Sequence, residues 1–116
     1  MEHIRINGRI SGGFESLTVD NTVGGVGFTA AKYLPTTGDF IGRRAQEAIC
    51  RFYSATLTSS IRFTTDGTAP TISVGTVLKP FEILTLDNPT DIVAFRAIIV
   101  SGTCTLDSTF QFDRRA

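Results

Sequence analysis

Residues 61–71 read Ile-Arg-Phe-Thr-Thr-Asp-Gly-Thr-Ala-Pro-Thr, and this stretch decides the expected fold. Apolar and polar residues alternate as far as Thr65, which predicts a strand, because side chains of a strand point alternately to its two faces. Asp66 and Gly67 then predict a tight turn, since aspartate bonds to nearby backbone and glycine accepts positive φ. Pro70 lacks an N–H, so the chain cannot continue there as a central strand. Asp66, Gly67 and Pro70 are therefore expected to form a structural turn.

Short segments of the same kind recur along the chain, bounded by Gly, Pro, Asn or Asp. The expected strands cover residues 14–20, 26–33, 43–53, 61–65, 72–78, 81–86, 91–100 and 103–112. Seven to eight short strands at this spacing predict an all-β chain folded as an antiparallel β-sandwich, jelly-roll-like. The strand order, which separates a jelly roll from an immunoglobulin-like sandwich, stays open at this point.

Two of these segments also have helical features. Residues 29–34 could form a short helical turn, and residues 44–49 contain good helix formers, so a strand is only the favoured interpretation of each. The most apolar run, residues 91–100, predicts a central strand covered on both faces. Ser101 and Gly102 then predict a two-residue hairpin leading into the last strand.

The chain is expected to be one domain with an arm. Residues 1–13 stand apart as an extended N-terminal arm, and residues 14–116 form a single β-sandwich domain. The arm carries His3, Ile4, Arg5 and Ile6, which are the candidate residues for contact with another subunit.

Charge and hydropathy exclude several partners. The 11 basic and 11 acidic residues cancel and form no long block, which argues against nucleic acid. No apolar run approaches the roughly 18 residues of a membrane span. No signal peptide is visible either, so we expect synthesis in a reducing cytoplasm.

No residue pattern predicts catalysis or a cofactor. The lone histidine, His3, lies in the arm without a nucleophile and an orienting group beside it. Cys50 and Cys104 lie inside apolar strand patterns and are expected to be buried thiols rather than zinc ligands or a disulfide. Asp87 and Asp91 flank a proline turn, where aspartate mostly caps backbone. A small hydrolase using these two carboxylates is the weakest alternative.

Sugar binding is a further alternative, because small sandwiches often stack sugars on exposed aromatic rings. The nine phenylalanines fall mostly on core positions and tryptophan is absent. Only Tyr33 and Tyr53 offer an amphipathic ring.

Residues 61–71, followed by Gly75 and later by residues 95–98, resemble a group of small structural proteins of tailed bacteriophages. In that group a similar stretch follows an Ala-rich strand like residues 44–49. The resemblance covers about residues 43–112, which is most of the chain.

The resemblance implies a non-enzymatic virion protein, most directly a capsid decoration or cement protein on the outer capsid surface. Such proteins act as dimers or trimers and clamp neighbouring subunits of the major capsid protein. Binding only to the assembled lattice would stabilise it by mass action. The alternative is a tail, baseplate or fibre component that binds a carbohydrate or receptor.

Overall fold

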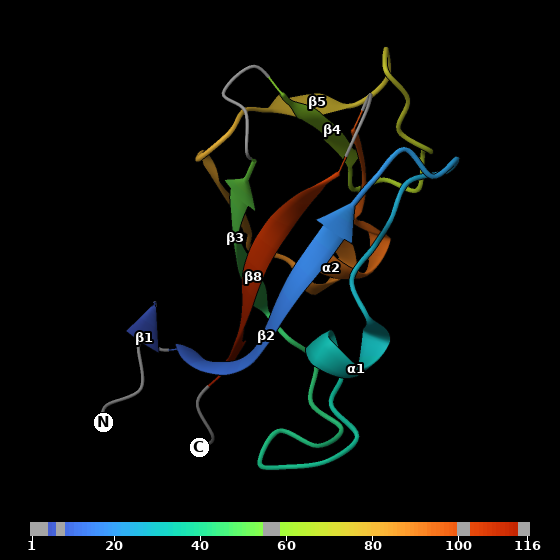
Figure 1. Cartoon of the computed structure of the whole chain (residues 1–116). Coiled ribbons are helices and arrows are strands. Elements are labelled where there is room, and N and C mark those ends of the chain that lie inside the picture. The colour runs from blue at the N-terminus through green and yellow to red at the C-terminus, as the bar shows by residue number, and fades with distance from the viewer. Residues whose placement is uncertain (1–4, 7–8, 55–58, 100–102, 114–116) are drawn as a thin grey trace.

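The chain is mostly β, with two antiparallel sheets (Figure 1). The computed structural model describes residues 5–6, 9–54, 59–99 and 103–113. Strands account for 45% of these residues and helices for 10%, which confirms the expected class and is compatible with a β-sandwich.

Five strands form the larger sheet, and all neighbours in it are antiparallel. Their order is β1 (Arg5–Ile6), β2 (Arg9–Val19), β8 (Cys104–Asp113), β3 (Glu47–Tyr53) and β6 (Ile83–Leu86). The smaller sheet has the order β5 (Thr76–Leu78), β4 (Ile61–Thr64) and β7 (Arg96–Ile99). An isolated antiparallel bridge between Val26 and Ala97 lays the segment after β2 along the free side of β7.

β8 is the central strand of the larger sheet. It pairs along its whole length with β2, from Arg9 opposite Asp113 to Val19 opposite Cys104. Its other side pairs with β3. The predicted alternation of β8 is confirmed, since the side chains that face inward are all buried: Cys104, Leu106, Ser108, Phe110 and Phe112.

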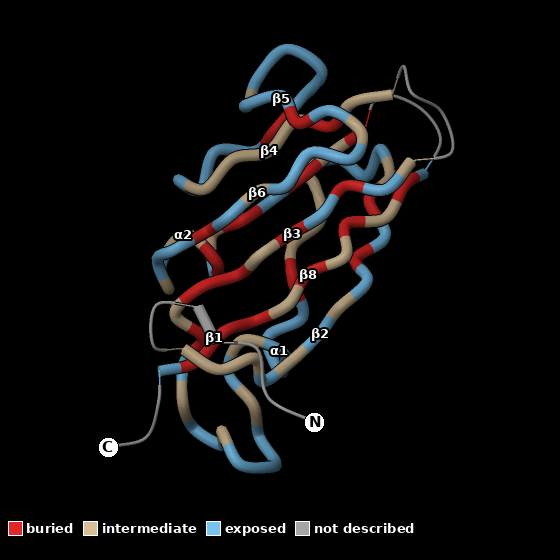
Figure 2. Tube along the Cα trace, turned by 90° about the vertical axis from the view of Figure 1, so that its left-hand side faces the viewer, coloured by how far each residue is buried: buried red, intermediate tan, exposed pale blue. Residues whose placement is uncertain are grey.

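One apolar core joins the two sheets. Phe110 of β8 makes an edge contact with Phe28, whose ring stacks on Phe95 at a centroid distance of 4.7 Å. From the smaller sheet, Ile61 and Ile99 enter the same buried cluster. The red segments of Figure 2 lie along the strands that enclose this core.

The prediction of a strand over residues 26–33 is wrong beyond the bridge at Val26. Residues Ala30–Tyr33 form the short helix α1 instead. The carboxylate of Glu15, on β2, accepts hydrogen bonds from the backbone N–H and the hydroxyl of Thr29, at 2.9 and 2.8 Å. This long-range contact holds the chain where α1 begins, and local alternation could not reveal it.

The apolar run 91–100 is not one central strand. Its first half belongs to the helix α2 (Pro89–Ala94), and its second half forms β7. Asn88 caps α2 by accepting a hydrogen bond from the Thr90 N–H at 2.8 Å, and Pro89 occupies the first turn. These residues start a helix rather than only a turn.

The expected hairpin at Ser101 and Gly102 lies outside the described residues. The strands that flank it, β7 and β8, belong to different sheets and do not pair with each other. The expected strand over 43–53 is confirmed for residues 47–53, which form β3.

The predicted boundary after residue 13 does not separate an arm from the sheet. Arg9, Ile10 and Ser11 already pair with β8, so residues 9–13 belong to β2. The pairing of β2 with β8 has a register irregularity between Ser11 and Gly13, as at a β-bulge.

Candidate binding sites at the β4–β5 loop and on the outer sheet face

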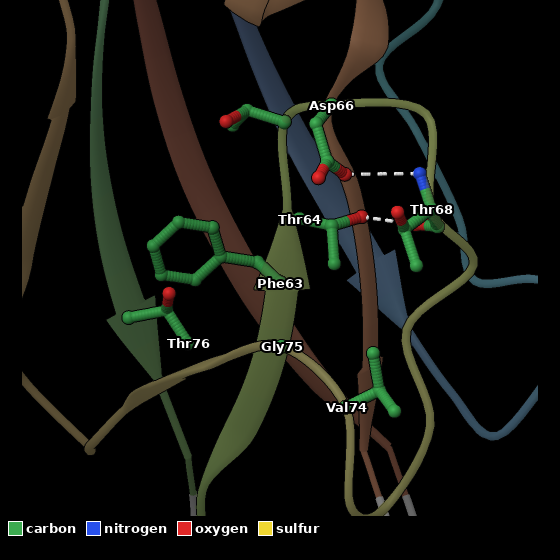
Figure 3. Close-up of a pocket in the computed structure, with 8 residues that line it drawn as sticks. Phe63, Thr64, Asp66, Thr68, Val74, Gly75 and Thr76 are labelled. Carbon is green, nitrogen blue, oxygen red and sulfur yellow. Dashed lines mark hydrogen bonds between the residues drawn. The ribbon is translucent and has the colours of Figure 1, made fainter.

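The loop after β4, residues 65–75, begins with a turn held by its own side chains (Figure 3). An oxygen of the Asp66 carboxylate accepts a hydrogen bond from the Thr68 N–H at 3.0 Å. Gly67 has φ +89°, a conformation that glycine adopts without strain. The Thr64 hydroxyl donates to the Thr68 carbonyl and ties the turn back to β4.

A second turn closes the other half of the loop. The Thr71 and Val74 backbones donate to each other's carbonyls at 3.0 and 3.3 Å. Pro70 is fully buried and anchors the middle of the loop. The Arg62 guanidinium donates to the Gly75 carbonyl at 2.8 Å, which fixes the return of the chain into β5.

Beside these turns lies an open, shallow hollow of about 340 Å³, at the small end of the range for ligand sites. It is lined by Phe63, Thr64, Thr65, Asp66, Thr68, Val74, Gly75 and Thr76. Phe63 is half-buried, and its ring stacks on Phe95 at 5.8 Å between centroids. In Figure 3 the Phe63 ring lies on one side of β4 beside Thr76, whereas Thr64, Thr68 and the Asp66 carboxylate lie on the other side.

Asp66 supplies the negative charge of this hollow. Hydrogen bonds from the Thr68 backbone and then its side chain hold the pKa of Asp66 below its usual value. The carboxylate is thus ionised at neutral pH and can accept hydrogen bonds from a hydroxyl or amine ligand. Among the described lining residues no second carboxylate is present, so the hollow lacks the acid–base pair of a glycosidase.

A second hollow, of about 490 Å³, lies at one end of the larger sheet. Its lining surface is mainly apolar, although five of the six lining residues carry a hydroxyl group: Thr18, Tyr53, Ser54, Thr103, Cys104 and Thr105. Tyr53 is 52% exposed, and its ring meets Phe81 edge-on at 5.5 Å. Of the two tyrosines proposed for sugar contact, Tyr53 is thus available to a ligand, whereas Tyr33 packs against the core.

The outer face of the larger sheet carries several large apolar side chains. Phe14 on β2 is 54% exposed and Ile83 on β6 is 62% exposed. Phe81, just before β6, is also exposed and has φ +67°, which is unusual for a bulky residue. Phe14 and Ile83 lie on β2 and β6, with β8 and β3 between them, so the exposed apolar side chains are spread across this face, as on a broad surface that contacts another protein.

The four candidate arm residues stay predictions. His3 and Ile4 lie outside the described residues. Arg5 and Ile6 form β1, whose backbone pairs with Ile10 and Arg9 of β2.

Both cysteines are buried and free, as predicted. Burial raises the pKa of Cys50 and the pKa of Cys104 to about 11 each. The thiols are therefore protonated at neutral pH and suited to packing rather than to nucleophilic chemistry.

The two carboxylates of the hydrolase alternative lie elsewhere. Asp91 is in the first turn of α2, where a negative charge is favourable, and Asp87 precedes the cap at Asn88. Neither residue lines either hollow.

Comparison with known proteins gives no relative. The chain matches no protein-family model, and no curated protein or solved structure is significantly similar to it. Within the described parts of the chain, no helix is long and apolar enough to cross a membrane. The same parts hold no cluster of three or more His, Cys, Asp or Glu side chains that could bind a metal ion.

Sequence reasoning missed the exposed edge formed by β6. The signal was present, because alternation placed Phe81, Ile83 and Thr85 on the face opposite Glu82, Leu84 and Leu86. The structure confirms this within β6, since Ile83 and Thr85 are exposed, Leu84 is half-buried and Leu86 is buried, whereas Glu82, before the strand, is exposed. Which face met solvent could not be known without the strand order.

Proposed function

We propose that this chain is a non-enzymatic structural protein of a tailed-phage virion that decorates the outer capsid surface. It binds the assembled lattice of the major capsid protein and stabilises it. The observation that carries this proposal is the outer face of the five-stranded sheet, which presents the exposed apolar side chains of Phe14 and Ile83 on antiparallel strands. Such a face suits contact with a protein surface better than conversion of a small substrate.

The strand order supports a jelly roll. With the two-residue β1 left out, β2 is the first strand and the bridged segment at Val26 is the second, so the other four strands of the larger sheet have the order first, eighth, third, sixth. The smaller sheet then has the order second, seventh, fourth, fifth. Viral capsid proteins and lectins both use jelly rolls of this kind, so the fold agrees with the resemblance of residues 61–71 to phage structural proteins.

The arm enters the proposal in a shortened form. Residues 9–13 are part of β2, so the candidate contact segment is residues 1–8, with His3, Ile4, Arg5 and Ile6 as its contact residues; Arg5 and Ile6 would act as the edge strand β1, which pairs with β2. An extension of this length can add a strand or a hook to a neighbouring subunit.

Co-sedimentation with capsids of the phage that carries the gene tests the function. We expect the protein to pellet with assembled capsids and not with unassembled capsid protein, because the seam between subunits exists only in the lattice. Phe14→Asp should weaken this binding at least tenfold. Val23→Asp is the matched control, since Val23 is 96% exposed but lies in the loop after β2, away from the outer face.

Three results would overturn the proposal: no binding to capsids, equal binding to free subunits, or equal losses from the two substitutions. Deletion of residues 1–8 tests the arm separately. Undiminished binding of that variant would remove the arm from the proposal and leave the sheet face.

A second candidate function is carbohydrate binding by a tail or fibre component. The hydroxyl-lined hollow beside the exposed ring of Tyr53 favours it, because sugars combine ring stacking with hydrogen bonds to hydroxyl groups. A glycan array decides the matter: binding that Tyr53→Ala abolishes would support this function, and an array without binding would remove it.

A further inference from the structure

β6 is a short edge strand whose own residues carry none of the charges or prolines that discourage pairing, although the chain is irregular at Phe81 and Glu82 just before it. It is the last strand of the larger sheet and lies next to β3, as Figure 2 shows. Its sequence, Ile83-Leu84-Thr85-Leu86, contains no charge and no proline. Edge strands normally carry such residues because an open edge accepts a strand from another chain.

The open side of β6 presents a defined set of backbone groups. At the start of the strand, the Phe52 N–H donates to the Glu82 carbonyl at 3.2 Å, and the Phe81 N–H donates to the Phe52 carbonyl at 2.8 Å. Hydrogen-bonded pairs alternate along an antiparallel ladder, so Leu84 and Leu86 also bond to β3. The N–H and C=O groups of Ile83 and Thr85 therefore point away from the sheet.

Two charges beside this edge form no ion pair with another described residue. Arg51 is exposed and lies directly beside Ile83, on β3. Asp107 is opposite Arg51 on β8, but its carboxylate accepts a hydrogen bond from Ser16 at 2.6 Å. Arg51 forms no ion pair within the described residues, and neither does the exposed Asp87 just beyond β6.

We propose that a second copy of this chain pairs antiparallel with β6 through its own β6, with Thr85 opposite Thr85 of the partner subunit. In this arrangement Ile83 is opposite Asp87 of the partner subunit. Arg51, Ile83 and the partner subunit's Asp87 then form one row on the outer face. About 10 Å separates Cα atoms two strands apart, a distance that an arginine and an aspartate together span. The two-fold axis repeats this ion pair.

The charges favour this register over the one that is shifted by two residues. Directly opposite residues in an antiparallel pair point to the same face, so shifts of the register must preserve the two faces. The nearest alternative places Ile83 opposite Thr85 of the partner subunit. It would set Asp87 beside the Phe81 ring and leave Arg51 without a partner, so charge complementarity favours Thr85 on the axis.

The proposal rests on the β6 edge and not on the capsid function. It is tested with the purified full chain in the absence of capsids, so its failure and the failure of the decoration function are separate results. If both hold, two outer faces join into one ten-stranded surface that can span two capsid subunits.

Analytical ultracentrifugation across protein concentrations gives the first test. We expect a monomer–dimer equilibrium that Thr85→Pro abolishes, because proline removes an N–H that points only toward the partner. The control is Val77→Lys, at an exposed position on the edge of the smaller sheet, which should leave the dimer intact. A proline at this position would not serve as the control, because Val77 pairs with β4. A monomer at all concentrations, a trimer, or a dimer that persists in Thr85→Pro would overturn the proposal.

Cross-linking tests the register. Paired residues opposite each other have Cα atoms about 5.5 Å apart, a separation that a disulfide bridges. Thr85→Cys should therefore form a disulfide-linked dimer on mild oxidation. Ile83→Cys should not, because the two copies of Ile83 are offset along the strands by four residues. Cys50 is fully buried and Cys104 lines the second hollow, so the parent chain oxidised in the same way is the control and should stay free of a linked dimer. The opposite pattern would overturn the register.

A charge exchange gives the third test. Arg51→Asp and Asp87→Arg should each raise the dimer dissociation constant about tenfold, since two ion pairs are lost in each symmetric dimer. The double variant should recover most of the parent's affinity. Additive losses in the double variant would show that Arg51 and Asp87 do not meet across the axis.

Discussion

The five-stranded sheet and the β4–β5 loop are held together in different ways. In the sheet, alternate side chains of β8 enter the core, and the backbone adopts ordinary extended geometry. In the loop, most side chains are exposed, and the conformation depends on glycines with positive φ and on short-range hydrogen bonds. Truncated side chains should therefore damage the sheet most, whereas added Cβ atoms should damage the loop.

The largest effect is expected from Phe110→Ala. Phe110 is fully buried in β8 and contacts Phe28, so its removal leaves a cavity and should cost about 3–5 kcal/mol of unfolding free energy. Urea denaturation gives this value. Phe14→Ala on the exposed face should cost less than about 1 kcal/mol. Similar losses for both variants would break the distinction between the two faces of the sheet.

Gly75→Ala should have the next largest effect. Gly75 has φ +122°, and a Cβ there would lie 3.0 Å from the Phe63 carbonyl oxygen. Backbone strain and this contact together should cost about 2–3 kcal/mol. An unfolding midpoint equal to that of the parent would show that the return of the chain into β5 does not require glycine.

Gly67→Val isolates backbone strain from crowding. Gly67 has φ +89° with no atom within 4 Å of an added Cβ, so only the conformation opposes a side chain. A β-branched residue at positive φ should cost about 1–2 kcal/mol. Gly67→Asn is the control, because asparagine tolerates this region and should lose less. Equal losses would mean that strain is not the cause.

The smallest effect concerns the charge on Asp66. Its folded pKa is depressed, so the contribution of the carboxylate is present above its ordinary value of 3.8 and is lost as pH falls through the folded pKa. The melting temperature of Asp66→Asn should therefore fall less steeply than that of the parent below about pH 4. Parallel acid profiles would show that the Thr68 hydrogen bonds do not depend on the charge.

Local patterns predicted much of the fold. Alternation predicted β8 and the two faces of β6, and turn chemistry predicted the geometry at Gly67, because these features depend on neighbours in sequence. The prediction of one strand over the apolar run 91–100 was wrong, because burial alone does not separate a helix from a strand. The cap at Asn88 and the proline after it carried the missing information.

The candidate sites were less predictable, because they depend on contacts between distant segments. The hollow beside Tyr53 needs β2, β3 and β8 side by side, and the open edge of β6 needs the full strand order. Glu15, on β2, similarly holds Thr29 at the start of α1 by a hydrogen bond. No local pattern encodes which strand lies beside which.

The pairing of β2 with β8 also limits how early the larger sheet can form during synthesis. Arg9 meets Asp113, so the first long strand cannot find its partner until nearly the whole described chain has been synthesised. Closure of a loop of this length is slow, and folding dominated by distant contacts is correspondingly slow. Until β8 arrives, β2 and β3 have no central strand between them, and a nascent chain is most prone to aggregate in that interval.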